Sequence, residues 1–69
     1  MEILKLRDDY IKLGQALKAA GFVSSGVEAK EVIRDGLVTV NGGTDTRRGR
    51  KLYAGDIAEY NGEQIKIEN

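Results

Sequence analysis

The spacing of apolar residues changes at Gly36, and this change limits the folds that the chain can adopt. Before Gly36, apolar residues recur at the three- and four-residue spacing of a helix that buries one face. After Gly36 the period becomes two, beginning with "LVTV" (37–40), which is typical of a strand. The sequence therefore predicts helices followed by a sheet, which is an α+β fold.

The first helix is predicted over residues 10–20. Asp8 and Asp9 precede it, where a carboxylate can accept hydrogen bonds from first-turn N–H groups and stabilise the positive end of the helix dipole. Capping explains this acidic pair better than catalysis, because consecutive residues do not project together from a helix. Gly21 should end the helix in the left-handed conformation of a Schellman motif. The expected apolar stripe consists of Tyr10, Leu13, Leu17 and Ala20.

The second helix is predicted to begin after Ser25 and to end at Gly36. Ser25 and Glu28 have the spacing of a capping box, in which Glu28 binds the N–H of Ser25. Gly14, inside the first helix, is expected to let the second helix approach closely. The expected apolar face consists of Ala29, Val32 and Ile33.

Several short strands are predicted around turn signals. "EILKL" (2–6) has strand composition, and "NGG" (41–43) follows "LVTV" as a turn. Asn61-Gly62 separates "IAEY" from "EQIKI" and is the strongest hairpin signal in the chain. Ala54-Gly55-Asp56 predicts one more turn. Together these signals predict a small, mostly antiparallel sheet.

Length and composition exclude most enzyme classes. Sixty-nine residues form a single domain, 1–69, and the chain contains neither His nor Cys. The usual zinc sites, iron–sulfur clusters, thiolate nucleophiles and near-neutral general bases are therefore absent. No metal, cofactor or small-molecule substrate is expected. No apolar run could cross a membrane or serve as a secretory signal, so a cytoplasmic location is expected.

Four cations fall within residues 47–51 of a chain that carries 11 basic and 11 acidic residues. Only Asp45 compensates them within the segment. A run of charge is usually a solvated loop, but the planar fork of Arg matches phosphate oxygens and stacks on bases. Tyr53, just downstream, could stack on a base or simply pack at a strand margin. The predicted nucleic-acid-binding loop comprises Arg47, Arg48, Arg50 and Lys51.

A second, weaker basic signal lies on the second helix. Lys30 and Arg34 are like charges four positions apart, which is mildly unfavourable without an anionic partner. Glu31 and Asp35 lie close enough to neutralise them, so a solvated face of mixed charge is the alternative.

Residues 12–42, "KLGQALKAAGFVSSGVEAKEVIRDGLVTVNG", resemble the S4 domain, a small RNA-binding module. The resemblance covers residues 10–60, and the "TRRGRKLYAGD" ending is similar to stand-alone bacterial members of the YbcJ and YaaA type. It implies a two-helix αL motif followed by a small, mostly antiparallel sheet. The positions that match the family pattern are Lys12, Leu13, Leu17, Ser25, Ala29, Ile33, Gly36 and Val38 to Gly42.

The resemblance also implies a binding surface for structured RNA across the helix pair and the adjoining strand loop. Two positions depart from the family: Gly26 stands where Arg is common, and Gly14 where Asp is common. We hypothesise that the Arg-rich loop supplies the missing charge. The positions implied for RNA contact are Lys12, Ser25, Lys30, Asn41 and Gly42.

The expected function is therefore non-catalytic RNA binding, with ribosomal RNA, a ribosomal subunit or tRNA as target. Two alternatives remain open. The chain could be a protein-interaction module that docks its Arg loop on an acidic partner, such as a ribosomal protein or a replication factor. It could also be an accessory subunit of an RNA-modifying enzyme.

Overall fold

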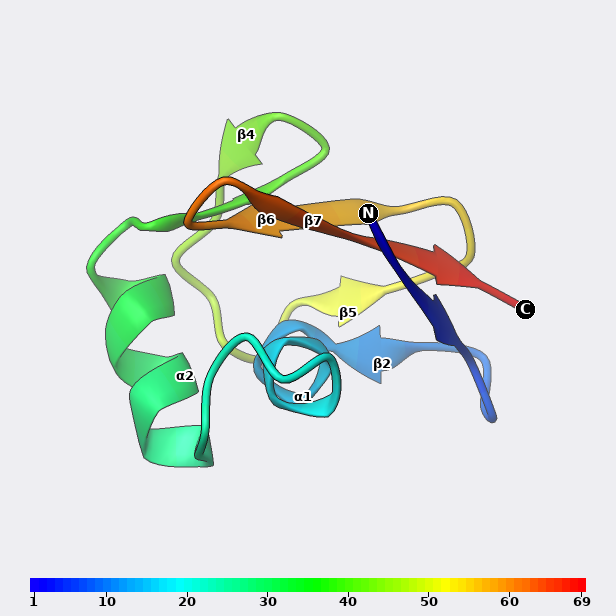
Figure 1. Ribbon diagram of the computed structural model, residues 1–69, viewed down its shortest axis with the longest axis horizontal. Helices are drawn as coiled ribbons and strands as arrows, with labels where there is room; N and C mark the ends of the chain where they lie inside the picture. The colour runs from blue at the N-terminus through cyan, green and yellow to red at the C-terminus, as the bar shows by residue number, and fades with distance from the viewer.

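A pair of helices covers one face of a five-stranded sheet, and a two-stranded ribbon lies beside the first helix (Figure 1). The structure is a computed structural model and describes residues 1–69. Neither helix has the length or apolar content that crossing a membrane requires. The elements are β1 (Glu2–Lys5), β2 (Ile11–Lys12), α1 (Leu13–Ala19), α2 (Gly26–Arg34), β3 (Val38–Val40), β4 (Gly43–Thr44), β5 (Lys51–Leu52), β6 (Ile57–Tyr60) and β7 (Glu63–Glu68).

The five-stranded sheet has the order β1-β7-β6-β3-β4, and the ribbon pairs β2 with β5. Every pairing is antiparallel except that of β1 with β7, so the predicted α+β fold with a mostly antiparallel sheet is confirmed. The parallel pair joins the first strand of the chain to the last. No local pattern in the sequence indicated it.

Both predicted Asn-Gly turns form tight hairpins. Asn41 and Gly42 have φ of 52° and 87° between β3 and β4, and Asn61 and Gly62 have φ of 54° and 80° between β6 and β7. Positive φ at both central residues is the type I′ geometry, whose twist matches that of the flanking strands. These turns fix the strand register, so the apolar positions of β3, β6 and β7 face the helices.

The core lies between the helix pair, the sheet and the ribbon. In β7 the alternation buries Ile65 and Ile67, while α1 contributes Leu13 and Leu17. Leu52 is the one fully buried residue of the ribbon. The complete core cluster comprises Leu13, Ala16, Leu17, Val23, Ala29, Ile33, Val38, Val40, Leu52, Ala58, Ile65 and Ile67.

Helix α1 begins later than predicted, and the acidic pair does not cap it. Residues 11–12 are extended and pair with β5, so the helix starts at Leu13. Its first N–H groups donate to loop carbonyls: Leu13 to Arg50 O at 2.8 Å and Gly14 to Arg48 O at 3.0 Å. Carbonyl oxygens supplied from a distant segment therefore do what a local carboxylate was expected to do. Tyr10, Asp8 and Asp9 lie outside the helix.

The C-terminal ends of both helices are as predicted. The N–H of Phe22 donates to Leu17 O at 2.9 Å, and the N–H of Leu37 donates to Val32 O at 3.1 Å. Each bond spans the left-handed glycine of a Schellman motif, Gly21 in the first case. Both helices therefore stop where the sequence places a glycine.

The N-terminus of α2 differs in one detail. Ser25 Oγ accepts the N–H of Glu28 at 3.1 Å, as expected of a cap. The Glu28 carboxylate does not bind Ser25 but accepts from the N–H and Oγ of Ser24, at 2.8 and 2.9 Å. The Ser24 N–H, followed by the Ser24 hydroxyl, lowers the pKa of Glu28. The capping box is thus displaced by one residue, because Ser24 offers two donors.

We expect Leu52→Ala to lower the free energy of unfolding by about 3 kcal/mol, because it leaves a cavity where the ribbon meets the core. Leu37→Ala is the matched control. Leu37 is 56% exposed, so Leu37→Ala should lower the free energy of unfolding by no more than about 1 kcal/mol. Urea denaturation followed by circular dichroism measures both. Equal losses would mean that Leu52 does not anchor the ribbon.

Candidate nucleic-acid interface

A cleft of about 380 Å³ lies between α1, the start of α2 and the loop before β5. Three cations from three different segments border it: Lys12, Lys18 and Arg48. No carboxylate lines it, and most of the other lining residues have small side chains or none. We call it the basic cleft; it is lined by Lys12, Gly14, Gln15, Lys18, Gly26, Ala29, Arg48 and Gly49.

The loop is held against α1 by its backbone. The carbonyls of Arg48 and Arg50 accept the first two amides of the helix, and Lys12 and Lys51 are Cα partners in the ribbon that follows. These contacts bring Arg48 beside the first turn of α1. An arginine that is far from α1 in the sequence therefore becomes one wall of the basic cleft.

Gly14 makes room for Arg48. A Cβ at Gly14 would lie 2.7 Å from Arg48 Cγ and 3.4 Å from Arg48 Cδ, and the first distance is too short for two carbon atoms. The expectation that Gly14 admits the second helix is therefore wrong. The close neighbour is the Arg48 side chain, because the loop, not α2, covers this turn of α1.

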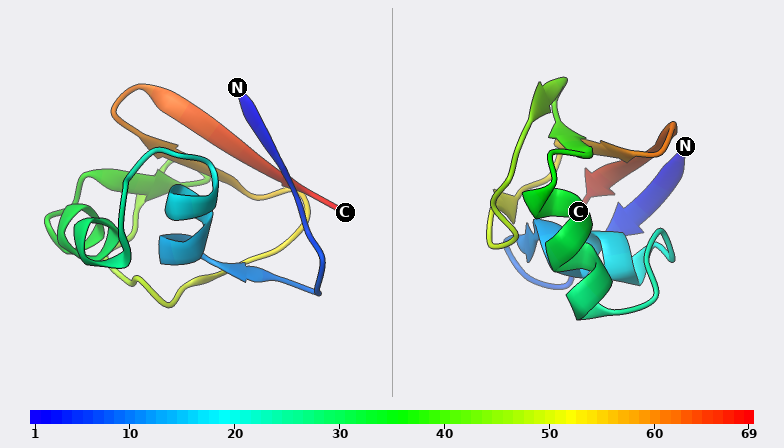
Figure 2. Two further views of the ribbon diagram at one scale, coloured as in Figure 1. Left: turned by 60° about the horizontal axis from the view of Figure 1, so that its bottom comes forward. Right: turned by 90° about the vertical axis from the view of Figure 1, so that its left-hand side faces the viewer.

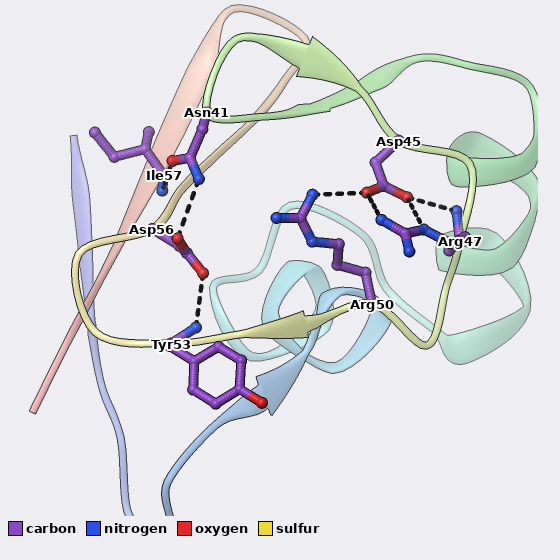
Figure 3. A network of polar contacts seen from close by, with 7 residues as sticks. All are labelled: Asn41, Asp45, Arg47, Arg50, Tyr53, Asp56 and Ile57. Atoms are coloured by element: carbon purple, nitrogen blue, oxygen red, sulfur yellow. Dashed lines mark hydrogen bonds and ion pairs between the residues drawn. The ribbon is translucent and has the colours of Figure 1, made fainter.

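Two of the four clustered cations are bound to a buried carboxylate. Asp45 has a side chain only 5% exposed, and it accepts from Arg47 Nε at 3.0 Å, Arg47 Nη2 at 2.8 Å and Arg50 Nη1 at 2.8 Å (Figure 3). It also accepts the backbone N–H of Arg47 at 2.9 Å. The hydrogen bonds from Arg47, with help from Arg50, hold the pKa of Asp45 well below its usual range.

The two arginines bound to Asp45 differ in exposure. The side chain of Arg50 is 29% exposed and serves mainly to hold the loop, whereas that of Arg47 is 70% exposed. Arg48 and Lys51 have no carboxylate within 4.0 Å. The cluster therefore divides into a clamp around Asp45 and two unpaired cations.

The predicted residues of α2 extend the basic cleft along one helix face. Gly26 lines the cleft, and Lys30 and Arg34 follow at successive four-residue steps on the same face. Lys30 has no ion-pair partner, and Arg34 Nε lies 3.9 Å from the exposed carboxylate of Asp35. Ser25 caps the helix next to Gly26.

The first two amides of α2, one of them in the cleft-lining residue Gly26, are unpaired. Neither the N–H of Gly26 nor that of Val27 has an acceptor in the protein, whereas the next two amides are bound to Ser25. Unpaired amides at the positive end of a helix attract anions.

Asn41 and Gly42 do not line the basic cleft. The Asn41 amide donates to Asp56 Oδ1 at 3.0 Å and accepts the N–H of Ile57 at 2.9 Å (Figure 3). Asp56 in turn accepts the N–H of Tyr53 at 2.8 Å. The hairpin of β3 and β4 projects away from the helix pair (Figure 2). The structure therefore gives the Asn41 side chain a role in joining the hairpin to the turn after β5.

Sequence reasoning missed two residues of the cleft, Gln15 and Lys18. Lys12, Gln15 and Lys18 are spaced three apart, on the opposite side of α1 from the buried leucines. This polar stripe is a sequence signal from which Gln15 and Lys18 could have been predicted. Gly49, which stands between the clustered cations in the sequence, also lines the cleft and leaves open space there.

The chain is similar to known proteins both in sequence and in fold. The family model of the S4 domain matches residues 4–68. The "Probable ribosome maturation protein RlbA" of Bacillus subtilis (strain 168) is 44% identical over 59 residues, which cover 86% of this chain and 83% of that protein. The "Putative RNA-binding protein YbcJ" of Escherichia coli (strain K12) is 33% identical over 58 residues, covering 84% of this chain and 83% of the relative.

A solved structure shares the whole fold. The solution structure of YbcJ from E. coli superposes with a TM-score of 0.76 at 30% identity, covering 100% of this chain and 89% of that one. It is described as revealing an αL motif involved in RNA binding. The expected two-helix αL motif is thereby confirmed. These relatives are named for RNA binding and ribosome maturation rather than for catalysis, in agreement with the expectation of no enzyme.

We expect Gly14→Ala and Arg48→Ala to be coupled. In an Arg48→Ala background, Gly14→Ala should raise the free energy of unfolding by up to about 1 kcal/mol, the gain usual for this exchange in a helix. In the unchanged protein the clash with Arg48 Cγ should cancel that gain. Chemical denaturation of the four proteins of this double-mutant cycle measures the coupling. Additive effects would show that Gly14 and Arg48 do not touch.

We expect Asp45→Asn to lower the free energy of unfolding at pH 7 by about 2 kcal/mol, because it removes a buried acceptor from two guanidinium groups. The pKa of Asp45 is lower in the folded state than its ordinary value of 3.8. Its stabilisation is therefore complete above that value and is lost as the pH falls further. The variant should lack this acid-dependent loss. Parallel stability curves for the two proteins between neutral and strongly acid pH would contradict the clamp.

Proposed function

Because the chain belongs to the S4 domain family, we propose that it is a non-catalytic RNA-binding protein whose basic cleft holds the sugar–phosphate backbone of a structured RNA. The observation that carries the proposal is the convergence of Lys12, Lys18 and Arg48 on one cleft without a carboxylate. Phosphate contacts of this kind supply most of the affinity of nucleic-acid binding.

The small residues of the cleft suit a bulky backbone. Gly26 and Gly49 leave open space where other residues would carry a side chain. A phosphate can therefore approach the unpaired amides of Gly26 and Val27 at the start of α2, where the helix dipole also attracts an anion. The cations around it then contact neighbouring phosphates.

Arg48 is the arginine that best compensates the departure from the family pattern at Gly26. It borders the cleft directly, whereas Arg50 is held by Asp45. Arg47 has most of its surface in solvent, and Lys30 and Arg34 prolong the basic face along α2. The proposed contacts are thus Arg48 in the cleft, with Arg47, Lys30 and Arg34 around it.

The clamp of Arg47 and Arg50 around Asp45 favours RNA binding, although Asp45 neutralises part of their positive charge. It orders the loop before RNA arrives, so binding need not lose the entropy of a mobile arginine-rich segment. The contact between the Arg48 side chain and Gly14 restricts Arg48 in the same way. A pre-ordered loop also discriminates by shape, which is how double-stranded RNA is mostly recognised.

Ribosomal RNA is the first candidate target and transfer RNA the second. The similarity to a protein named for ribosome maturation supports this order. We propose the cytoplasm as the location, because these RNAs are assembled and used there. Ribosomal subunit proteins become neighbours of the chain if its RNA site lies on an assembling subunit.

We expect Arg48→Ala and Lys18→Ala each to weaken binding to purified ribosomal RNA about fivefold to tenfold, with each change reducing the salt slope by about 1. With three cleft cations on phosphates, affinity of the unchanged protein should fall about 40-fold for a fourfold rise in salt. Filter binding at several salt concentrations measures both quantities, with bulk transfer RNA as the second probe.

Lys66→Ala is the control for net charge. Lys66 lies on β7 and does not line the basic cleft, so its loss should leave affinity nearly unchanged. A loss as large as that of Arg48→Ala would mean that binding has no localised site. Partners that still co-purify after nuclease treatment would instead favour the protein-interaction module or the accessory subunit.

A further inference from the structure

The β2–β5 ribbon has an outward face that the fold does not use. Ile11 and Leu52 are Cα partners, Leu52 is fully buried, and Ile11 packs against the core. Because side chains alternate along strands, the flanking residues point the other way. We call this surface the ribbon face; it consists of Tyr10, Lys12, Lys51 and Tyr53.

Core packing does not account for its two tyrosines. Tyr60 packs against the core cluster, but neither Tyr10 nor Tyr53 does. Tyr53 is 49% exposed. The rings of Tyr10 and Tyr53 contact each other with centroids 5.9 Å apart and planes tilted by 50°, a favourable aromatic geometry. The pair therefore presents a supported aromatic surface to solvent.

The ribbon face is held in place before any ligand binds. The N–H of Tyr53 donates to Asp56, and Asp56 is itself held by Asn41 (Figure 3). Lys51 Nζ lies 4.8 Å from the centre of the Tyr10 ring in a cation–π contact. The strand end, both rings and one of the two lysines are thus fixed relative to one another.

The charges of the ribbon face lack an anionic partner. Lys12 and Lys51 are directly opposite each other, an arrangement that is unfavourable for like charges. Neither has a carboxylate within 4.0 Å. An anion placed between them would remove this repulsion.

The ribbon face is continuous with the basic cleft. Lys12 lines the cleft and also a hollow of about 750 Å³ beside Tyr10. Asp8 and Asp9 line the same hollow together with Arg7, so it offers carboxylates to the amino groups of a base as well as cations to a phosphate. A nucleotide strand that leaves the cleft past Lys12 would therefore find phosphate partners and an aromatic surface together.

We propose that the ribbon face binds an unpaired nucleotide that continues from the RNA helix held in the basic cleft. Its base stacks on Tyr53, and its phosphate lies between Lys12 and Lys51. Stacking on aromatic side chains next to basic groups is the usual mode of single-strand recognition. This inference rests on the proposed function and makes the preferred target a junction between duplex and single strand.

The test compares two RNAs that differ only in an unpaired tail. One is a blunt hairpin of about 16 base pairs, and the other carries about five added unpaired nucleotides. The unchanged protein should bind the tailed RNA about tenfold more tightly. Tyr53→Leu should abolish that difference and leave binding of the blunt hairpin unchanged, whereas Tyr53→Phe should preserve it because the ring remains.

Tyrosine fluorescence gives a second readout, since the chain has three Tyr and no Trp. The tailed RNA should quench it more than the blunt hairpin does, and Tyr53→Leu should remove the excess quenching. Circular dichroism checks that the variant is folded, as expected for a side chain outside the core.

The outcomes separate this inference from the proposed function. Two results would overturn the proposed role of the ribbon face and leave the proposed function standing. The unchanged protein could bind tailed and blunt RNA equally tightly, or Tyr53→Leu could lose the same affinity for both RNAs. Binding of neither RNA overturns the proposed function as well. If poly-glutamate is bound by the unchanged protein and lost in Tyr53→Leu, with no effect of the tail, the surface belongs to an acidic protein partner and the inference is wrong.

Discussion

The arrangement of the candidate site depends on two hydrogen bonds from the start of α1 to the carbonyls of Arg48 and Arg50. A helix begins with amides that have no partner within the helix, and here a loop from the second half of the chain satisfies them. The ribbon pairing, the contact of Arg48 with Gly14 and the position of the cleft all follow from this attachment. The loop thus acts as the N-terminal cap of α1.

The sequence predicted those parts of the fold that local chemistry determines. Glycines ended both helices, and Asn-Gly pairs formed both hairpins, because each of these depends on a backbone conformation available within a few residues. The start of α1 was misjudged, since the acceptors for its amides come from residues 48 and 50. The pairing of β1 with β7 escaped prediction for the same reason: it joins segments whose sequences carry no mutual signal.

The candidate site was predictable in composition but not in geometry. Lys12 and Arg48 were both named from the sequence, and the structure brings them to one cleft. Asn41 was named too, but its amide is engaged with Asp56 and Ile57. The count of four loop cations also overstated the free charge, because it could not show that the one nearby carboxylate, Asp45, is buried and binds two of them. A charge pattern in the sequence locates a basic segment. Only the side-chain contacts in the structure show which of its cations hold the loop and which are exposed.

The parallel pair at the edge of the sheet has a consequence for how the chain folds during synthesis. The hairpin of β6 and β7 can form as soon as its residues are available, but β1 has no partner until residues 63–68 have been made. Pairing across nearly the whole chain also carries a large loop-closure entropy and is therefore slow. Strand β1 therefore joins the sheet only after β7 has been made, and until then β7 is an open edge of the sheet.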